Sequence, residues 1–70
     1  MKAMYVYQTP GTYVLLRGPH LSDWLRDQGI PAVRAPLDRG HKLRREQLPD
    51  LLAAAAESHV PVHMRAGDRA

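Results

Sequence analysis

The chain has 70 residues, of which 44% are hydrophobic and 24% are charged. This length holds one small hydrophobic core, and the composition is that of a globular rather than a disordered protein. We therefore expect a single domain over residues 1–65 and a frayed polar tail over residues 66–70. The core must be thin, because the chain has no Phe and one Trp, and small domains of this kind often gain stability from a partner or from self-association.

The formal net charge is +3, and Arg supplies eight of the ten basic residues. The planar guanidinium group suits phosphate or carboxylate, so the composition is compatible with an anionic partner, although a GC-rich coding sequence would also favour Arg. The absence of Cys excludes disulfides and thiolate metal sites. No signal-peptide core and no stretch of about 20 apolar residues is present, so we expect a soluble, cytoplasmic protein.

Two strands joined by a turn are predicted at the start of the chain, over residues 3–8 and 12–17. Both segments are rich in the β-branched and aromatic residues that fit a pleated sheet. Between them, Pro10 and Gly11 have the dihedral preferences of a tight turn. The sequence therefore predicts an N-terminal β-hairpin.

A helix is predicted over residues 19–28. Leu21, Trp24 and Leu25 fall three and four positions apart, and Gly29 suits the position just past the helix end. A second helix is predicted over residues 46–58, where Leu and Ala recur at helical spacing after an acidic first turn.

Residues 30–46 lie between the two helices and read as a second hairpin, with strands over 31–37 and 41–45. We expect Gly40 in the left-handed conformation of the loop. Alternation along the strands would turn Val33, Ala35, Leu37 and Leu43 toward the helices and Arg34 away from them. A last strand is predicted over residues 60–64.

The predicted order is strand, strand, helix, strand, strand, helix, strand. If the first strand is set aside, this is the β-α-β-β-α-β order of the ferredoxin-like fold. We therefore expect an α+β domain with both helices on one face of the sheet and the other face exposed. In architecture the chain resembles small ferredoxin-like regulatory domains, which bind nucleotides, metals or partner proteins and host many unrelated functions.

Residues 24–52 also resemble the DNA-binding domains of the MerR and excisionase type. The positions that carry the resemblance are Trp24, Gly29, Arg34, Gly40-His41, Arg45 and Leu48. It implies a winged helix that reads DNA with its first helix and contacts phosphates through the hairpin. A complete winged helix would be helical over residues 12–16, where the ferredoxin-like alternative has a strand.

The candidate site is a basic group on and beside the 30–46 hairpin. Its members are Arg34, Arg39, Lys42, Arg44 and Arg45, together with Arg17 and a possible stacking ring, Tyr13. Basic side chains with an aromatic among them, on the exposed face of a sheet, suit phosphate contacts and base stacking. A charged outer face is also the ordinary way for a sheet to meet water, and His63 and Arg65 are expected on the same face.

No pattern typical of an enzyme is present. The chain has no Cys nucleophile, carboxylate pair or Gly-rich phosphate loop, so we expect no catalytic residue and no cofactor. His59 and His63 would need a third ligand, such as His41 or Asp38, to hold zinc, and we expect no metal site.

Two functions of different classes follow from these observations. The first is a small regulatory protein that binds DNA or RNA through the hairpin. The second is a non-enzymatic adaptor or inhibitor that binds a protein partner and can form a homodimer, with Tyr5, Tyr7, Tyr13 and Leu15 supplying apolar area. Neither function involves a membrane.

Overall fold

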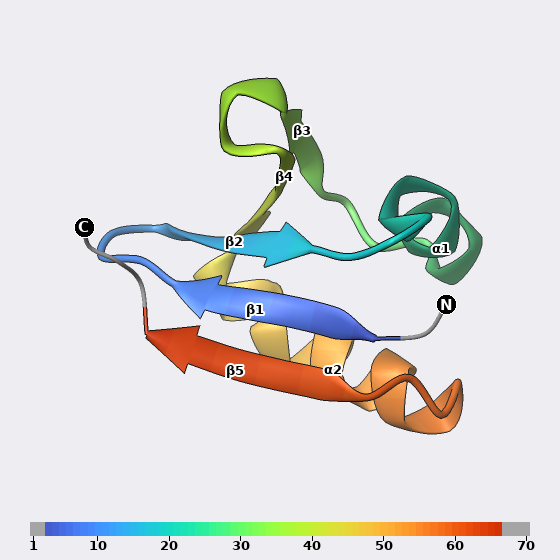
Figure 1. The fold of residues 1–70 in the computed structure, drawn as a ribbon. Coiled ribbons are helices and arrows are strands. Elements are labelled where there is room, and N and C mark those ends of the chain that lie inside the picture. The colour runs from blue at the N-terminus through green and yellow to red at the C-terminus, as the bar shows by residue number, and fades with distance from the viewer. Residues whose placement is uncertain (1–2, 67–70) are drawn as a thin grey trace.

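A computed structural model describes residues 3–66 as a five-stranded sheet with two helices (Figure 1). The elements in chain order are β1 (Met4–Gln8), β2 (Tyr13–Arg17), α1 (Leu21–Gln28), β3 (Val33–Ala35), β4 (Gly40–Arg44), α2 (Leu48–Glu57) and β5 (Val62–Ala66). Short 3-10 turns, η1 (Pro36–Asp38) and η2 (Arg45–Gln47), follow β3 and precede α2. The predicted α+β class and the predicted order of elements are confirmed. Ala66 of the expected tail ends β5, and residues 67–70 lie outside the described part.

The strands are arranged in the order β3-β4-β2-β1-β5. All neighbouring strands are antiparallel except β1 and β5, which run parallel. The N-terminal strand is thus an interior strand of a mixed sheet, paired with β2 on one side and β5 on the other. Residues 13–17 are extended, and this segment distinguishes the two predicted folds, because a winged helix would be helical here.

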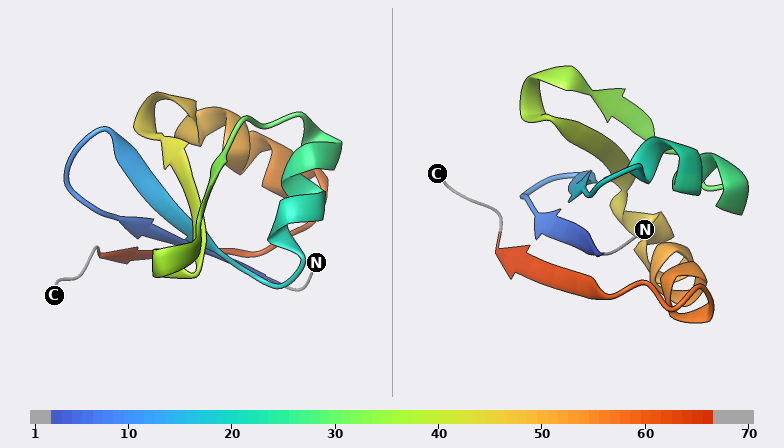
Figure 2. Two further views of the ribbon diagram at one scale, coloured as in Figure 1. Left: turned by 90° about the horizontal axis from the view of Figure 1, so that it is seen from above. Right: turned by 45° about the vertical axis from the view of Figure 1, so that its right-hand side comes forward.

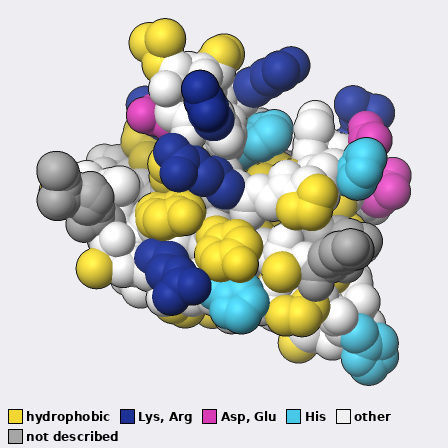
Figure 3. Space-filling model, in the orientation of Figure 1, with side chains coloured by type: hydrophobic (Ala, Val, Ile, Leu, Met, Phe, Trp, Pro, Cys, Tyr) yellow, Lys and Arg dark blue, Asp and Glu magenta, His cyan; other side chains and the backbone are white. Residues whose placement is uncertain are grey.

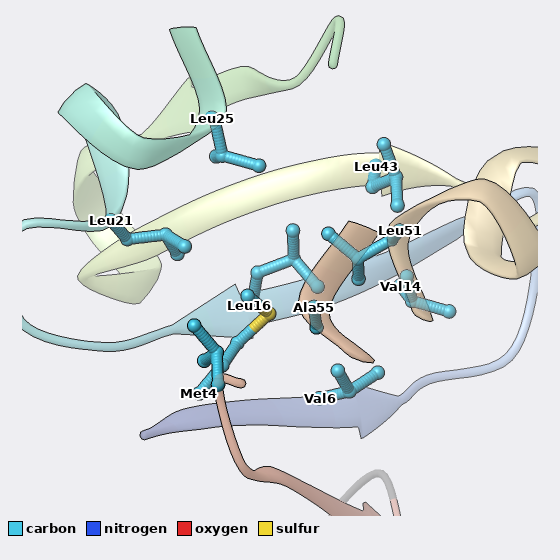
Figure 4. Close-up of a cluster of buried hydrophobic side chains, with 10 residues drawn as sticks. Met4, Val6, Val14, Leu16, Leu21, Leu25, Leu43, Leu51 and Ala55 are labelled. Carbon is cyan, nitrogen blue, oxygen red and sulfur yellow. The ribbon is translucent and has the colours of Figure 1, made fainter. Parts of the chain in front are cut away.

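Both helices cover the same face of the sheet, and the opposite face is open (Figure 2). Alternation along the strands turns one set of apolar side chains toward the helices. The apolar faces of α1 and α2 pack against these side chains. The buried cluster that results is drawn in Figure 4, and its members are Met4, Val6, Val14, Leu16, Leu21, Leu25, Leu43, Leu51, Ala55 and Val60. Leu43 faces the helices as predicted.

The expected orientation of β3 is wrong. Val33 is 65% exposed and Leu37, in the turn after β3, is 99% exposed, although both were expected to face the helices. Val33 pairs with Lys42, which points to the open face because its neighbour Leu43 is buried. A register that differs by one residue sends every side chain of a strand to the other face, so Arg34 shares the helix side with its partner His41.

The left-handed residue of the β3–β4 loop is Arg39, with φ 55°, and the prediction of Gly40 is wrong. Glycine is instead required at position 40 because β4 lies close to β2 there. A Cβ at this position would collide with the backbone oxygen of Leu16. The predicted glycine after α1 is confirmed. Gly29 has φ 70°, and its N–H donates to the carbonyl oxygen of Arg26.

The two described helices have eight and ten residues. Within residues 3–66, neither helix has the length and apolar character needed to cross a lipid bilayer.

Candidate functional site

The open face of the sheet carries rows of side chains that run across neighbouring strands. The longest row crosses all five strands and consists of Arg65, Tyr7, Leu15, Lys42 and Val33, each paired with the next. A second row is His63, Tyr5 and Arg17. Tyr13 and Arg44 form a third pair. Figure 3 shows this face, on which basic and apolar side chains alternate.

Cations and aromatic rings are in direct contact in these rows. The guanidinium carbon of Arg17 lies 5.1 Å from the ring centroid of Tyr7, and that of Arg65 lies 5.5 Å from the ring of Tyr5. The Tyr5 ring also stacks on the His63 ring at 4.9 Å, with 22° between the planes. Such contacts restrain the rings. They leave the face positively charged, because none of the five strands contains Asp or Glu.

Four residues of the predicted site, Tyr13, Arg17, Lys42 and Arg44, lie on this face as expected. Lys42 and Arg44 point away from the helices on β4, and Tyr13 is 42% exposed opposite Arg44. The Arg44 Nε lies 3.2 Å from a carboxylate oxygen of Glu46 in an exposed pair. An exposed pair of this kind is weak, so Arg44 remains available to an anion.

Arg17 and Arg45 hold the backbone in place. Nε and one terminal nitrogen of Arg17 donate to the carbonyl oxygen of Asp38 at 3.0 and 2.8 Å, which ties β2 to the β3–β4 loop. Arg45 donates from Nε to the carbonyl oxygen of Gly11 at 3.0 Å and from a terminal nitrogen to that of Thr9. Arg45 therefore clamps the β1–β2 turn and does not lie on the open face.

Arg34 and Arg39 lie elsewhere again, in a hollow of about 460 Å³ between the start of α1 and the β3–β4 hairpin. Arg17, His20 and His41 also line this hollow. Burial, together with the charge of Arg34, holds the pKa of His41 below its ordinary value of 6.5.

The predicted basic group is thus divided among three places: the open face, the clamp on the β1–β2 turn, and the hollow beside α1. His63 and Arg65 lie on the open face as expected, and Tyr5 and Tyr7, which the dimer hypothesis used, lie there too. None of these four was included in the predicted nucleic-acid site. Strict alternation in residues 3–8 and 60–64 contained the signal, since it assigns these side chains to the face opposite the buried Met4 and Val6.

Within residues 3–66, no three side chains among His, Asp and Glu come together in a way that could hold a metal ion. Comparison of the sequence with protein-family models and curated proteins, and of the fold with solved structures, found no match.

Proposed function

We propose that the protein binds single-stranded nucleic acid through the open face of its sheet, with little sequence preference, and that it acts as a regulatory protein. The observation that supports this most is the alternation of three tyrosines with four cations, on strands that contain no carboxylate. The tyrosines are Tyr5, Tyr7 and Tyr13, and the cations are Arg17, Lys42, Arg44 and Arg65. Single strands present bases and phosphates together, so rings and cations are engaged at once.

The dimensions of the face suit a short stretch of strand. Neighbouring strands lie about 4.8 Å apart, so the row from Arg65 through Tyr7 and Leu15 to Lys42 spans about 14 Å. Sheet platforms in known RNA-binding modules stack two or three bases on their aromatics. Tyr13 is the most exposed aromatic ring, and we assign it as the main stacking position.

The proposal is tested by fluorescence anisotropy with labelled random-sequence RNA, single-stranded DNA and duplex DNA. The chain offers a matched pair of variants, Arg44→Gln and Arg26→Gln. Each removes one arginine from an exposed ion pair, 3.2 Å to Glu46 for Arg44 and 3.7 Å to Asp23 for Arg26. Arg44 lies on the open face, and Arg26 lies on α1 behind the sheet.

We expect Arg44→Gln to weaken single-strand binding several-fold and to reduce the slope of log affinity against log salt by about 0.7. Arg26→Gln should bind like the wild type, because it changes the net charge equally but removes no phosphate contact. Equal effects of the two variants would mean that net charge, and not this face, governs binding.

A second candidate is protein interaction, including homodimer formation. It is favoured by the exposed apolar side chains Val33 and Leu37, which are 65% and 99% exposed at one edge of the sheet. Light scattering separates the two, since a monomer that binds RNA argues against a dimer whose sheets face each other.

At the level of fold, we propose a ferredoxin-like β-α-β-β-α-β domain into which β1 is inserted. In support, β4 lies between β2 and β3 and is antiparallel to both, which is the split βαβ pattern. Removing β1 would bring β5 next to β2. A winged helix is the weaker alternative, because residues 13–17 form a strand.

A further inference from the structure

The hollow beside α1 is a second place at which the protein can hold an anion. We propose that it binds a phosphate monoester, carried by a free nucleotide or by the end of a nucleic-acid strand. The hollow lies between the first turn of α1 and the β3–β4 hairpin and is lined by Arg17, Gly18, Arg34, Arg39 and His41 among others. Among the described residues, Arg17 is the one that the hollow shares with the open face, since Lys42, Arg44, Arg65 and the three tyrosines do not line it. The inference does not rest on binding at the open face, because it depends on Arg34 and Arg39, which lie outside that face.

The charged residues that line the hollow are all basic. Arg34 and Arg39 make no hydrogen bond or ion pair through their side chains within residues 3–66. No Asp or Glu lines the space. Guanidinium groups suit a phosphate, to which each can donate two hydrogen bonds, and Arg34 and Arg39 both line this space. The guanidinium of Arg17 is held by the carbonyl oxygen of Asp38, so it adds charge while it fixes the hairpin.

Polar groups other than the arginines also face this space. His20 precedes α1 in the left-handed conformation, and no side chain caps the helix. The first N–H groups of α1 therefore have no side-chain partner, and the helix dipole favours an anion there. His41 is another lining residue, but its Nδ1 is buried, makes no hydrogen bond within the described residues and is not one of the groups that face the space. Ser22 belongs to the same lining.

The size of the hollow indicates a small ligand. A volume of about 460 Å³ falls in the range of about 300–1,000 Å³ that is usual for small-molecule sites. Leu21 and Pro36 add apolar surface to the lining, which suits the organic part of a phosphate monoester. An isolated inorganic ion would use only part of the space.

The test is a titration of ¹⁵N-labelled protein, at constant ionic strength, with inorganic phosphate and with adenosine 5′-monophosphate. We expect amide shifts to concentrate at residues 20–23 and 34–41. Arg34→Gln and Arg39→Gln should each weaken binding of the monophosphate about tenfold or more, the loss of one charged hydrogen bond. Arg26→Gln on the same helix is the matched control and should bind like the wild type.

A pair of oligonucleotides, with and without a 5′-phosphate, then distinguishes the two sources of the monoester. A preference for the phosphorylated strand that disappears in Arg34→Gln identifies the end of a nucleic acid. Equal binding of both strands, with retained binding of the mononucleotide, identifies a free nucleotide. Shifts spread evenly over the protein, or equal weakening by Arg26→Gln and Arg34→Gln, would overturn the proposed site. None of these results depends on whether the open face binds RNA.

Discussion

Replacement of Arg45 by Met is the sharpest test of how the structure divides the basic residues of the hairpin. The guanidinium of Arg45 donates to the carbonyl oxygens of Gly11 and Thr9, and its backbone N–H donates to that of Thr12 at 2.7 Å. Met keeps the apolar stem and removes both side-chain hydrogen bonds. The β1–β2 turn would then be tied to the start of η2 by the backbone hydrogen bond to Thr12 alone.

The expected loss of stability follows from the two hydrogen bonds. A hydrogen bond to a charged group contributes about 1.5–3 kcal/mol, and the bond to Gly11 is exposed and counts for less. We therefore expect Arg45→Met to lower the free energy of unfolding by about 2 kcal/mol. For a domain of this size the Tm should fall by about 8–16 °C.

Urea denaturation and a thermal scan followed by circular dichroism measure this change. Arg44→Met is the control, because it alters the neighbouring residue, which makes only an exposed ion pair with Glu46, and it should cost less than about 0.5 kcal/mol. If the two variants are equally stable, the clamp does not exist and Arg45 belongs with the other surface cations.

Further predictions concern the core, the hairpin and pH. Gly40→Ala should lower the free energy of unfolding by about 3 kcal/mol or leave the protein unfolded, because its Cβ would collide with the backbone of β2; urea denaturation measures it. Leu51→Ala should cost about 2–5 kcal/mol, since Leu51 is fully buried, whereas Leu37→Ser should change stability by less than about 0.5 kcal/mol. The pKa of His41 is lowered in the folded state, so its contribution to stability is complete above pH 6.5 and is lost as the pH falls below that value. Burial is the larger cause of the lowered His41 pKa and the charge of Arg34 the smaller one, so an NMR titration of Arg34→Gln should show a higher His41 pKa that stays below 6.5. An unchanged pKa would contradict the contribution of Arg34.

Most of the fold could be predicted because each element has its own local signal. Helix periodicity around Leu21 and Leu25, Gly29 after α1, and alternation in β1 and β2 are decided by neighbours in the sequence. The position of β1 inside the sheet had no such signal, because pairing between β1 and β5 joins the two ends of the chain.

The errors occurred where contacts between strands decide the outcome. The apolar residues Val33 and Leu37 predicted an inward face for β3, but this strand has three residues and takes its register from β4. At the loop, Gly40 is required by its contact with β2, which leaves the left-handed position to Arg39. Both outcomes depend on segments distant in the sequence.

The candidate site was less predictable than the fold. Net charge and arginine content do not tell which guanidinium groups are used by the backbone, and the structure assigns Arg17 and Arg45 to carbonyl oxygens. The Lys42 and Arg44 positions followed from alternation alone. The position of Arg34 was predicted wrongly, because the predicted orientation of β3 was wrong by one residue.

Aromatic NMR spectra recorded during a titration with a short single-stranded RNA test the central proposal most directly. All three tyrosines of the chain lie on the open face, and the single tryptophan, Trp24, lies on α1 and packs against the core from the other side. If bases stack on the sheet, the ring signals of the tyrosines, Tyr13 above all, should move upfield while those of Trp24 stay in place. Stationary tyrosine signals at saturating RNA, or a Trp24 shift of equal size, would contradict binding through this face.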